Sequence, residues 1–84
     1  MRENAGFLIV GSVPVAKDLE VVIGFKTTSL GDQYVCWYCK NQNDYFWGRY
    51  TKKYEDVVRV LMERIETYYP IEKYEEDSDT ATVD

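Results

Sequence analysis

The sequence predicts an α+β fold: an antiparallel meander of four strands (three at the least) followed by one C-terminal amphipathic helix on one sheet face, in the order ββββα. Short apolar runs rich in β-branched and aromatic residues fill residues 6–50 and alternate with polar segments. Apolar residues then recur at helical spacing over residues 54–69. The 84 residues suffice for one small domain. We expect it over residues 1–70, with an acidic disordered tail over 71–84.

The first two expected strands differ in pattern. Residues 6–15 (GFLIVGSVPV) form an apolar run, in which Pro14 suits an edge position or the end of a strand because it donates no ladder hydrogen bond. Residues 20–27 (EVVIGFKT) alternate with period two, as a strand with two different faces does. One face holds Val21, Ile23 and Phe25, and the other holds Glu20, Val22, Gly24 and Lys26.

Two further strands form the most aromatic part of the chain. A turn at residues 29–33 (SLGDQ), with Gly31-Asp32 as its tight point, precedes the expected strand 34–40 (YVCWYCK). The polar residues 41–44 (NQND) then connect it to the strand 45–50 (YFWGRY) as a hairpin loop.

The helix is predicted by an apolar stripe at positions i, i+3, i+4 and i+7. Thr51 is the expected N-cap, and Pro70 is expected to end the helix. Off the stripe, Arg59 is spaced to pair with Glu55 and with Glu63. The stripe consists of Tyr54, Val57, Val58, Leu61, Met62, Ile65, Tyr68 and Tyr69.

The register of the last hairpin decides which aromatic residues the helix covers. An even loop places Asn41 opposite Asp44 and Trp37 over Gly48, where a large ring can shield exposed strand backbone. An odd loop places Trp37 and Trp47 on one face instead. With the even loop, the helix covers Val35, Trp37, Cys39, Phe46 and Tyr50. The candidate interface on the open face is then Tyr34, Tyr38, Tyr45, Trp47 and Arg49.

This open face has three interpretations. Tyr and Trp are ordinary cross-strand partners on a half-solvated sheet. Tyr, Trp and Arg are also enriched in the hot spots of protein interfaces, which indicates a protein partner or a homodimer. Aromatic rings stack on unpaired bases as well, so single-stranded nucleic acid is the alternative ligand, with Lys40, Arg49, Lys52 and Lys53 as phosphate contacts.

The C-x-x-C spacing of Cys36 and Cys39 does not indicate redox or zinc chemistry. In an extended strand, residues i and i+3 point to opposite faces and lie roughly 10 Å apart. A disulfide requires about 4.4–6.8 Å between Cα atoms, and a zinc site requires further Cys or His ligands that the chain lacks. We expect two apolar strand residues, with no metal and no cofactor.

Charge and composition argue against an enzyme. The chain has no histidine and no phosphate-binding glycine motif. Residues 1–70 carry nine basic and nine acidic side chains, so the net charge of −5 belongs to residues 71–84. Nucleic acid is therefore an unlikely partner, although an acidic tail can also act as an inhibitor or DNA mimic. The cysteines and the absence of an apolar membrane-spanning run favour the cytoplasm over a membrane.

The hairpin and the helix after it resemble a family of small uncharacterised bacterial proteins associated with mobile elements. The resemblance covers residues 4–68, and no activity is assigned to that family. It implies an accessory or host-interaction role, because small acidic proteins of mobile elements often act by binding host machinery. The matching positions are Tyr34, Val35, Trp37, Cys39, Tyr45, Trp47, Gly48 and Tyr50.

Overall fold

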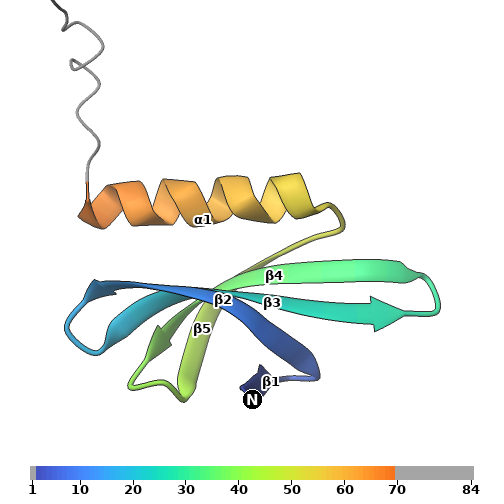
Figure 1. Ribbon diagram of the computed structural model, residues 1–84, viewed down its shortest axis with the longest axis horizontal. Helices are drawn as coiled ribbons and strands as arrows, with labels where there is room; N and C mark the ends of the chain where they lie inside the picture. The colour runs from blue at the N-terminus through green and yellow to red at the C-terminus, as the bar shows by residue number, and fades with distance from the viewer. Residues whose placement is uncertain (1, 70–84) are drawn as a thin grey trace, which may run out of the picture.

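The computed structural model, which describes residues 2–69, contains an antiparallel sheet of strand order β1-β2-β3-β4-β5 with helix α1 across one face (Figure 1). The expected α+β meander is confirmed, with one short strand more than predicted. The expected tail at 71–84 lies outside the described residues. The elements are β1 (Glu3–Asn4), β2 (Phe7–Ala16), β3 (Leu19–Thr28), β4 (Gly31–Lys40), β5 (Asp44–Thr51) and α1 (Tyr54–Tyr68).

The additional strand β1 is half of a tight hairpin. Asn4 pairs with Phe7, and the two residues between them, Ala5 and Gly6, both have positive φ angles of 53° and 84°. Two positive φ values are what a type I′ turn requires, and its twist matches that of the flanking strands. A strand of two residues is too short to produce a periodic pattern, which is why the sequence did not predict it.

The β3–β4 hairpin determines how the two long central strands face each other. Its turn is Ser29-Leu30, two residues earlier than predicted, because Thr28 pairs directly with Gly31. The Thr28 hydroxyl donates to the Gly31 carbonyl at 2.8 Å and accepts from the Leu30 amide at 3.1 Å. This register places Tyr34, Cys36 and Tyr38 opposite the apolar side chains Phe25, Ile23 and Val21.

Helix α1 begins later than expected. Its N-cap is Lys53, which makes no capping hydrogen bond with its side chain. The expected cap, Thr51, instead donates its hydroxyl to the Lys53 carbonyl at 3.0 Å, so that prediction was wrong. Arg59 pairs with Asp56 at 3.1 Å, rather than with Glu55 or Glu63.

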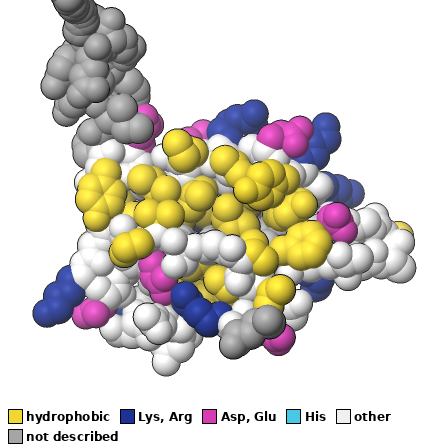
Figure 2. Space-filling model, in the orientation of Figure 1, with side chains coloured by type: hydrophobic (Ala, Val, Ile, Leu, Met, Phe, Trp, Pro, Cys, Tyr) yellow, Lys and Arg dark blue, Asp and Glu magenta, His cyan; other side chains and the backbone are white. Residues whose placement is uncertain are grey.

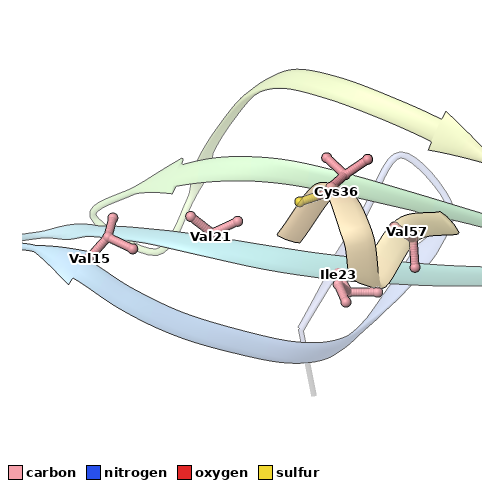
Figure 3. Close-up of a cluster of buried hydrophobic side chains, with 6 residues drawn as sticks. Val15, Val21, Ile23, Cys36 and Val57 are labelled. Atoms are coloured by element: carbon pink, nitrogen blue, oxygen red, sulfur yellow. The ribbon is translucent and has the colours of Figure 1, made fainter. Parts of the chain in front are cut away.

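Two separate apolar clusters lie on the two faces of the sheet. The helix-side cluster consists of the buried residues Val15, Val21, Ile23, Cys36, Val57 and Val60 (Figure 3). The far-side cluster consists of the buried residues Phe7, Val22, Val35, Trp37 and Cys39. The two cysteines thus belong to different clusters, which confirms the prediction that they point to opposite faces; both are free thiols.

The helix covers the opposite face from the one predicted. It packs over the face of Cys36 and not over that of Val35, Trp37 and Cys39. The reason is the β3–β4 register, which joins the Cys36 face of β4 to the most apolar face of β3. Burying that continuous apolar surface under α1 removes the most hydrocarbon from water.

The far face is covered by the sheet itself. Figure 1 shows β1, the start of β2 and the hairpin between β4 and β5 on the side of the sheet away from the helix. The rings of Phe7 from β2 and Tyr50 from β5 both contact Trp37, at centroid distances of 5.6 and 6.3 Å, and approach each other to 5.9 Å. Register shifts at Val10 in β2 and opposite Trp37 in β5 bend these two strands.

Candidate interaction surface

The β4–β5 hairpin has an odd loop and a compensating bulge. Lys40 pairs with Asp44, which leaves a loop of three residues, so the predicted even loop and the facing of Asn41 and Asp44 were wrong. Tyr38 pairs with Phe46, but Cys36 pairs with Arg49, so β5 has one residue more than β4 in between. That bulge restores the predicted alignment of Trp37 with Gly48.

The contact between Trp37 and Gly48 is confirmed in detail. A Cβ atom added to Gly48 would lie 2.7 Å from Trp37 Nε1 and 3.0 Å from Trp37 Cδ1. No side chain other than hydrogen fits there without displacing the indole. Glycine at this position therefore allows Trp37 to close over the β5 backbone.

The bulge residue itself is Trp47, in an unusual backbone conformation. Its φ angle is 57°, in the left-handed region that glycine and asparagine tolerate and that large side chains rarely adopt. Such a conformation costs roughly 1–2 kcal/mol. Trp47 is 73% exposed, so burial of its ring in the folded chain offsets little of that conformational cost. Glycine or asparagine would adopt this conformation at lower cost, which makes the exposed Trp47 a candidate binding residue.

Trp47 is part of a group of rings that we call the aromatic patch. It consists of Tyr38, Phe46, Trp47 and Tyr68. The ring of Tyr38 stacks on that of Phe46, with the ring centroids 5.8 Å apart. It makes edge-to-face contacts with the rings of Trp47 and Tyr68, at centroid distances of 5.7 and 6.3 Å. Phe46 and Trp47 contact each other at 5.5 Å. Strands β4 and β5 and the last turn of α1 thus contribute to one surface.

Two arginines lie beside this patch. The guanidinium carbon of Arg64 lies 4.8 Å from the centre of the Tyr38 ring, and Arg64 donates to the Cys36 carbonyl at 2.9 Å. Arg49 is the cross-strand partner of Cys36. Burial raises the pKa of the Cys36 thiol, and the charges of Arg64 and Arg49 oppose that rise. Both cations are therefore placed next to Cys36, Arg64 by its hydrogen bond and Arg49 by strand pairing.

The five predicted interface residues do not share a face. Tyr34 and Tyr38 pack against the helix-side cluster, and Tyr45 packs against the far-side cluster, so the prediction of one open aromatic face was wrong. The structure brings Tyr38, Trp47 and Arg49 to one region. Tyr34 instead contacts Phe25 and Tyr54, and Tyr45 contacts Trp37.

Sequence reasoning missed three members of this region: Phe46, Arg64 and Tyr68. Arg64 and Tyr68 are separated by one helical turn and therefore share a helix face, which the sequence already showed. The even loop placed Phe46 opposite Cys39, whereas it lies opposite Tyr38 and stacks on that ring. The alternation of β3, combined with a two-residue turn at Ser29-Leu30, would have identified the correct face.

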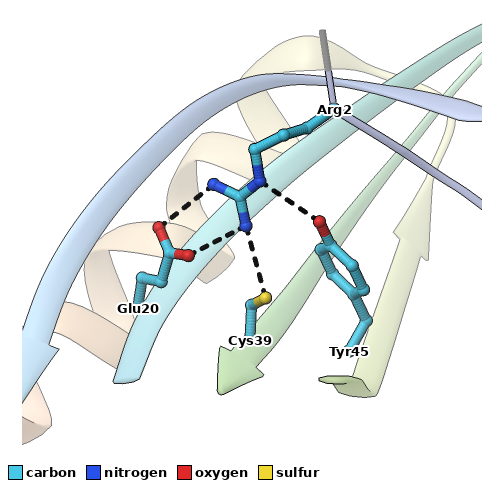
Figure 4. Close-up of polar contacts among 4 residues, drawn as sticks. All are labelled: Arg2, Glu20, Cys39 and Tyr45. Carbon is cyan, nitrogen blue, oxygen red and sulfur yellow. Dashed lines mark hydrogen bonds and ion pairs between the residues drawn. The ribbon is translucent and has the colours of Figure 1, made fainter. Parts of the chain in front are cut away.

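Tyr45 is held by a polar cluster on the far side of the sheet (Figure 4). Arg2 donates to both carboxylate oxygens of Glu20, at 2.8 and 3.3 Å, to the Tyr45 hydroxyl at 3.3 Å and to the Cys39 sulfur at 3.3 Å. Burial favours a higher pKa for Glu20, but the hydrogen bonds and charge of Arg2 hold that pKa below its ordinary value. This cluster ties the N-terminal segment to the sheet and holds Tyr45 on the far face, away from the aromatic patch.

The thiols offer no activated nucleophile. Burial raises the pKa of the Cys39 thiol, with the Arg2 charge opposing it, as burial raises the pKa of Cys36. A thiol with a raised pKa is protonated at neutral pH and reacts slowly. The two cysteines therefore serve as small apolar core residues.

The remaining hydrophobic surface lies along the helix. Figure 2 shows hydrophobic side chains in a band where α1 overlies the sheet. Val58, Leu61 and Ile65 are only half-buried against the helix-side cluster, while Tyr54 and Met62 are more than half exposed. The helix thus seals the core incompletely along one side.

Comparison with known protein families, with curated proteins and with solved structures gives no match for this chain. Over residues 2–69, the single helix is too short and too polar to cross a membrane.

Proposed function

We propose that this protein is a non-enzymatic interaction module of the cytoplasm that binds a protein partner, either another protein or a second copy of itself, through the aromatic patch. The observation that carries the proposal is Trp47, which is strained in its backbone and exposed in its side chain. Trp, Tyr and Arg are the residue types that contribute most binding energy in protein interfaces.

The surroundings of Trp47 support this role. Its indole is held against Tyr38 and Phe46, so few rotamers remain to be lost when a partner binds. The patch is formed by two strands and a helix rather than by a loop, which gives it a defined shape. A partner that covered Trp47 would bury most of a large ring that water now contacts. The favourable free energy of burying that ring is therefore obtained only in the complex.

A photo-crosslinking amino acid at position 47 tests the proposal in cells. The matched control is position 30, since Leu30 is 95% exposed but lies in the β3–β4 turn, outside the patch. We expect a discrete adduct from position 47 and none from position 30. An adduct of twice the mass of the chain identifies a second copy, and any other protein adduct identifies a different partner.

Substitution of Trp47 then measures the energy of the contact. We expect Trp47→Ala to weaken binding of the crosslinked partner by at least about 30-fold, the effect of a hot-spot residue, whereas Leu30→Ala leaves binding unchanged. No adduct at position 47, or equal adducts at both positions, contradicts the proposal. A nuclease-sensitive adduct would assign the patch to single-stranded nucleic acid instead, because exposed rings beside arginines also stack on bases.

A further inference from the structure

We infer that the partner segment bound by the aromatic patch is an acidic peptide segment, one carboxylate of which pairs with Arg49 and Arg64. This inference rests on the proposed function and specifies the chemistry of the partner. The aromatic rings would hold an apolar side chain of the same segment, while the two guanidinium groups select the charge beside it.

The charges around Cys36 favour an anionic partner. Arg64 is fixed by its hydrogen bond to the Cys36 carbonyl and by its position over Tyr38, and Arg49 pairs with the same Cys36 from β5. Within residues 2–69, the ion pairs are Arg2–Glu20 and Arg59–Asp56, so neither Arg49 nor Arg64 has a carboxylate partner there. Two like charges near one residue repel each other, and an anion between them relieves that repulsion.

Both guanidinium groups keep unused hydrogen-bond donors. A guanidinium group has five N–H donors in a planar fork. Arg64 uses one of them on the Cys36 carbonyl, and Arg49 makes no hydrogen bond through its side chain within the described residues. Arg–carboxylate pairs use two parallel donors, which gives both energy and direction. The site is therefore suited to a planar carboxylate at the border of the patch.

The distribution of charge over the chain favours a peptide over a nucleic acid. A nucleic-acid strand is attracted by an extended basic surface that releases many counterions. Residues 1–70 are neutral overall, and the chain carries a net charge of −5. Two local cations can pair with one or two carboxylates of a peptide but cannot follow a phosphate backbone. Charge complementarity here is local, as in a peptide-recognition site.

Fluorescence polarisation with the full chain tests this inference. The probe is a fluorescein-labelled peptide in which Glu and Asp are interleaved with Leu, and its control replaces every acid by Gln or Asn. We expect the acidic peptide to bind at least about tenfold more tightly at 50 mM salt, with the difference shrinking at 500 mM salt as the charges are screened. Oligo-dT of similar length should bind more weakly than the acidic peptide.

Matched arginine variants locate the contact. We expect Arg49→Gln to weaken binding of the acidic peptide about fivefold while leaving the neutral peptide unaffected. Arg64→Lys should reduce the same preference, because a lysine cannot form the two parallel bonds. The control is Arg59→Gln, since Arg59 is exposed like Arg49 and helical like Arg64 but is paired with Asp56. Equal effects of Arg49→Gln and Arg59→Gln would overturn the inference.

The chain's own acidic residues provide the final control. Glu72, Glu75, Glu76 and Asp77 have the charge of the proposed ligand, so they can compete with the probe. A variant with these four acids neutralised should bind the acidic peptide at least as tightly as the native chain does. If neither chain distinguishes acidic from neutral peptide, the inference fails. If a crosslinked adduct still forms at position 47 in that case, the proposed function stands without this inference. If no adduct forms at position 47, both the proposed function and this inference fail.

Discussion

The two tryptophans lie in one hairpin, yet the regions around them serve opposite purposes. Trp37 is 4% exposed and packs with Phe7 and Tyr45 in the far-side cluster, whereas Trp47 is 73% exposed in the aromatic patch. The bulge in β5 separates them. It inserts Trp47 as an additional residue opposite Trp37, and the side chain of Trp47 is thereby directed to the other side of the sheet. One indole therefore stabilises the fold, and the other remains available for binding.

The largest expected effect is that of Trp37→Ala. Removing a buried indole leaves a cavity and is expected to lower the free energy of unfolding by about 3–5 kcal/mol. Urea denaturation followed by far-UV circular dichroism measures this loss, and Trp37→Phe provides a milder variant if the alanine variant does not fold. The matched substitution is Trp47→Ala. Equal losses at positions 37 and 47 would contradict the distinction between the two regions.

A smaller loss is expected from overpacking the same cluster through Gly24→Ala. A Cβ atom there would lie 3.0 Å from Phe7 Cβ and from Val35 Cγ1, and 3.1 Å from Trp37 Cζ3. We expect a loss of about 1–3 kcal/mol in the same denaturation experiment. The control is Gly11→Ala, where no atom lies within 4 Å. A neutral Gly24→Ala would show that the far-side cluster packs more loosely than the structure indicates.

The polar cluster over the far face is expected to contribute on the order of 1–2 kcal/mol. The folded state lowers the pKa of Glu20 from 4.5, so its contribution is complete above pH 4.5 and is lost as the pH falls through the lower folded-state value. We expect Glu20→Gln to destabilise the protein at pH 7 and to converge with the native chain in acid.

Denaturation midpoints at pH 7 and near pH 3 test this prediction, with the exposed Glu3→Gln as control. A difference between Glu20→Gln and the native chain that did not change with pH would show that the Arg2–Glu20 contact stabilises the fold through packing rather than charge.

The smallest effect on stability is expected at Trp47. Trp47→Gly removes ring contacts with Tyr38 and Phe46 but also removes the strain of the left-handed conformation, so the two changes nearly cancel and the free energy of unfolding should shift by less than about 1 kcal/mol. Thermal melting of the variant measures this shift. Trp47→Val serves as the contrast, because a β-branched residue keeps the strain and loses the rings. A loss above about 3 kcal/mol for the glycine variant would identify Trp47 as a core residue.

Local sequence patterns were enough to predict the meander, the helix and the separation of the two cysteines. Period-two alternation in β3, helical periodicity after residue 54 and the i, i+3 spacing of Cys36 and Cys39 are local properties of the chain. The contact of Trp37 with Gly48 was also predictable, because an aromatic ring and a strand glycine are complementary in size.

The face that the helix covers and the place where the aromatic residues gather depend instead on contacts between elements. Three local details set these outcomes: the two-residue turn at Ser29-Leu30, the three-residue loop after Lys40 and the bulge at Trp47. A shift of one residue moves every side chain of a strand to the other face, so each detail changes the whole surface while leaving the sequence pattern intact. Arg64 and Tyr68 lie beside Tyr38 because of the way α1 lies across the sheet. Their own sequence context does not indicate this contact.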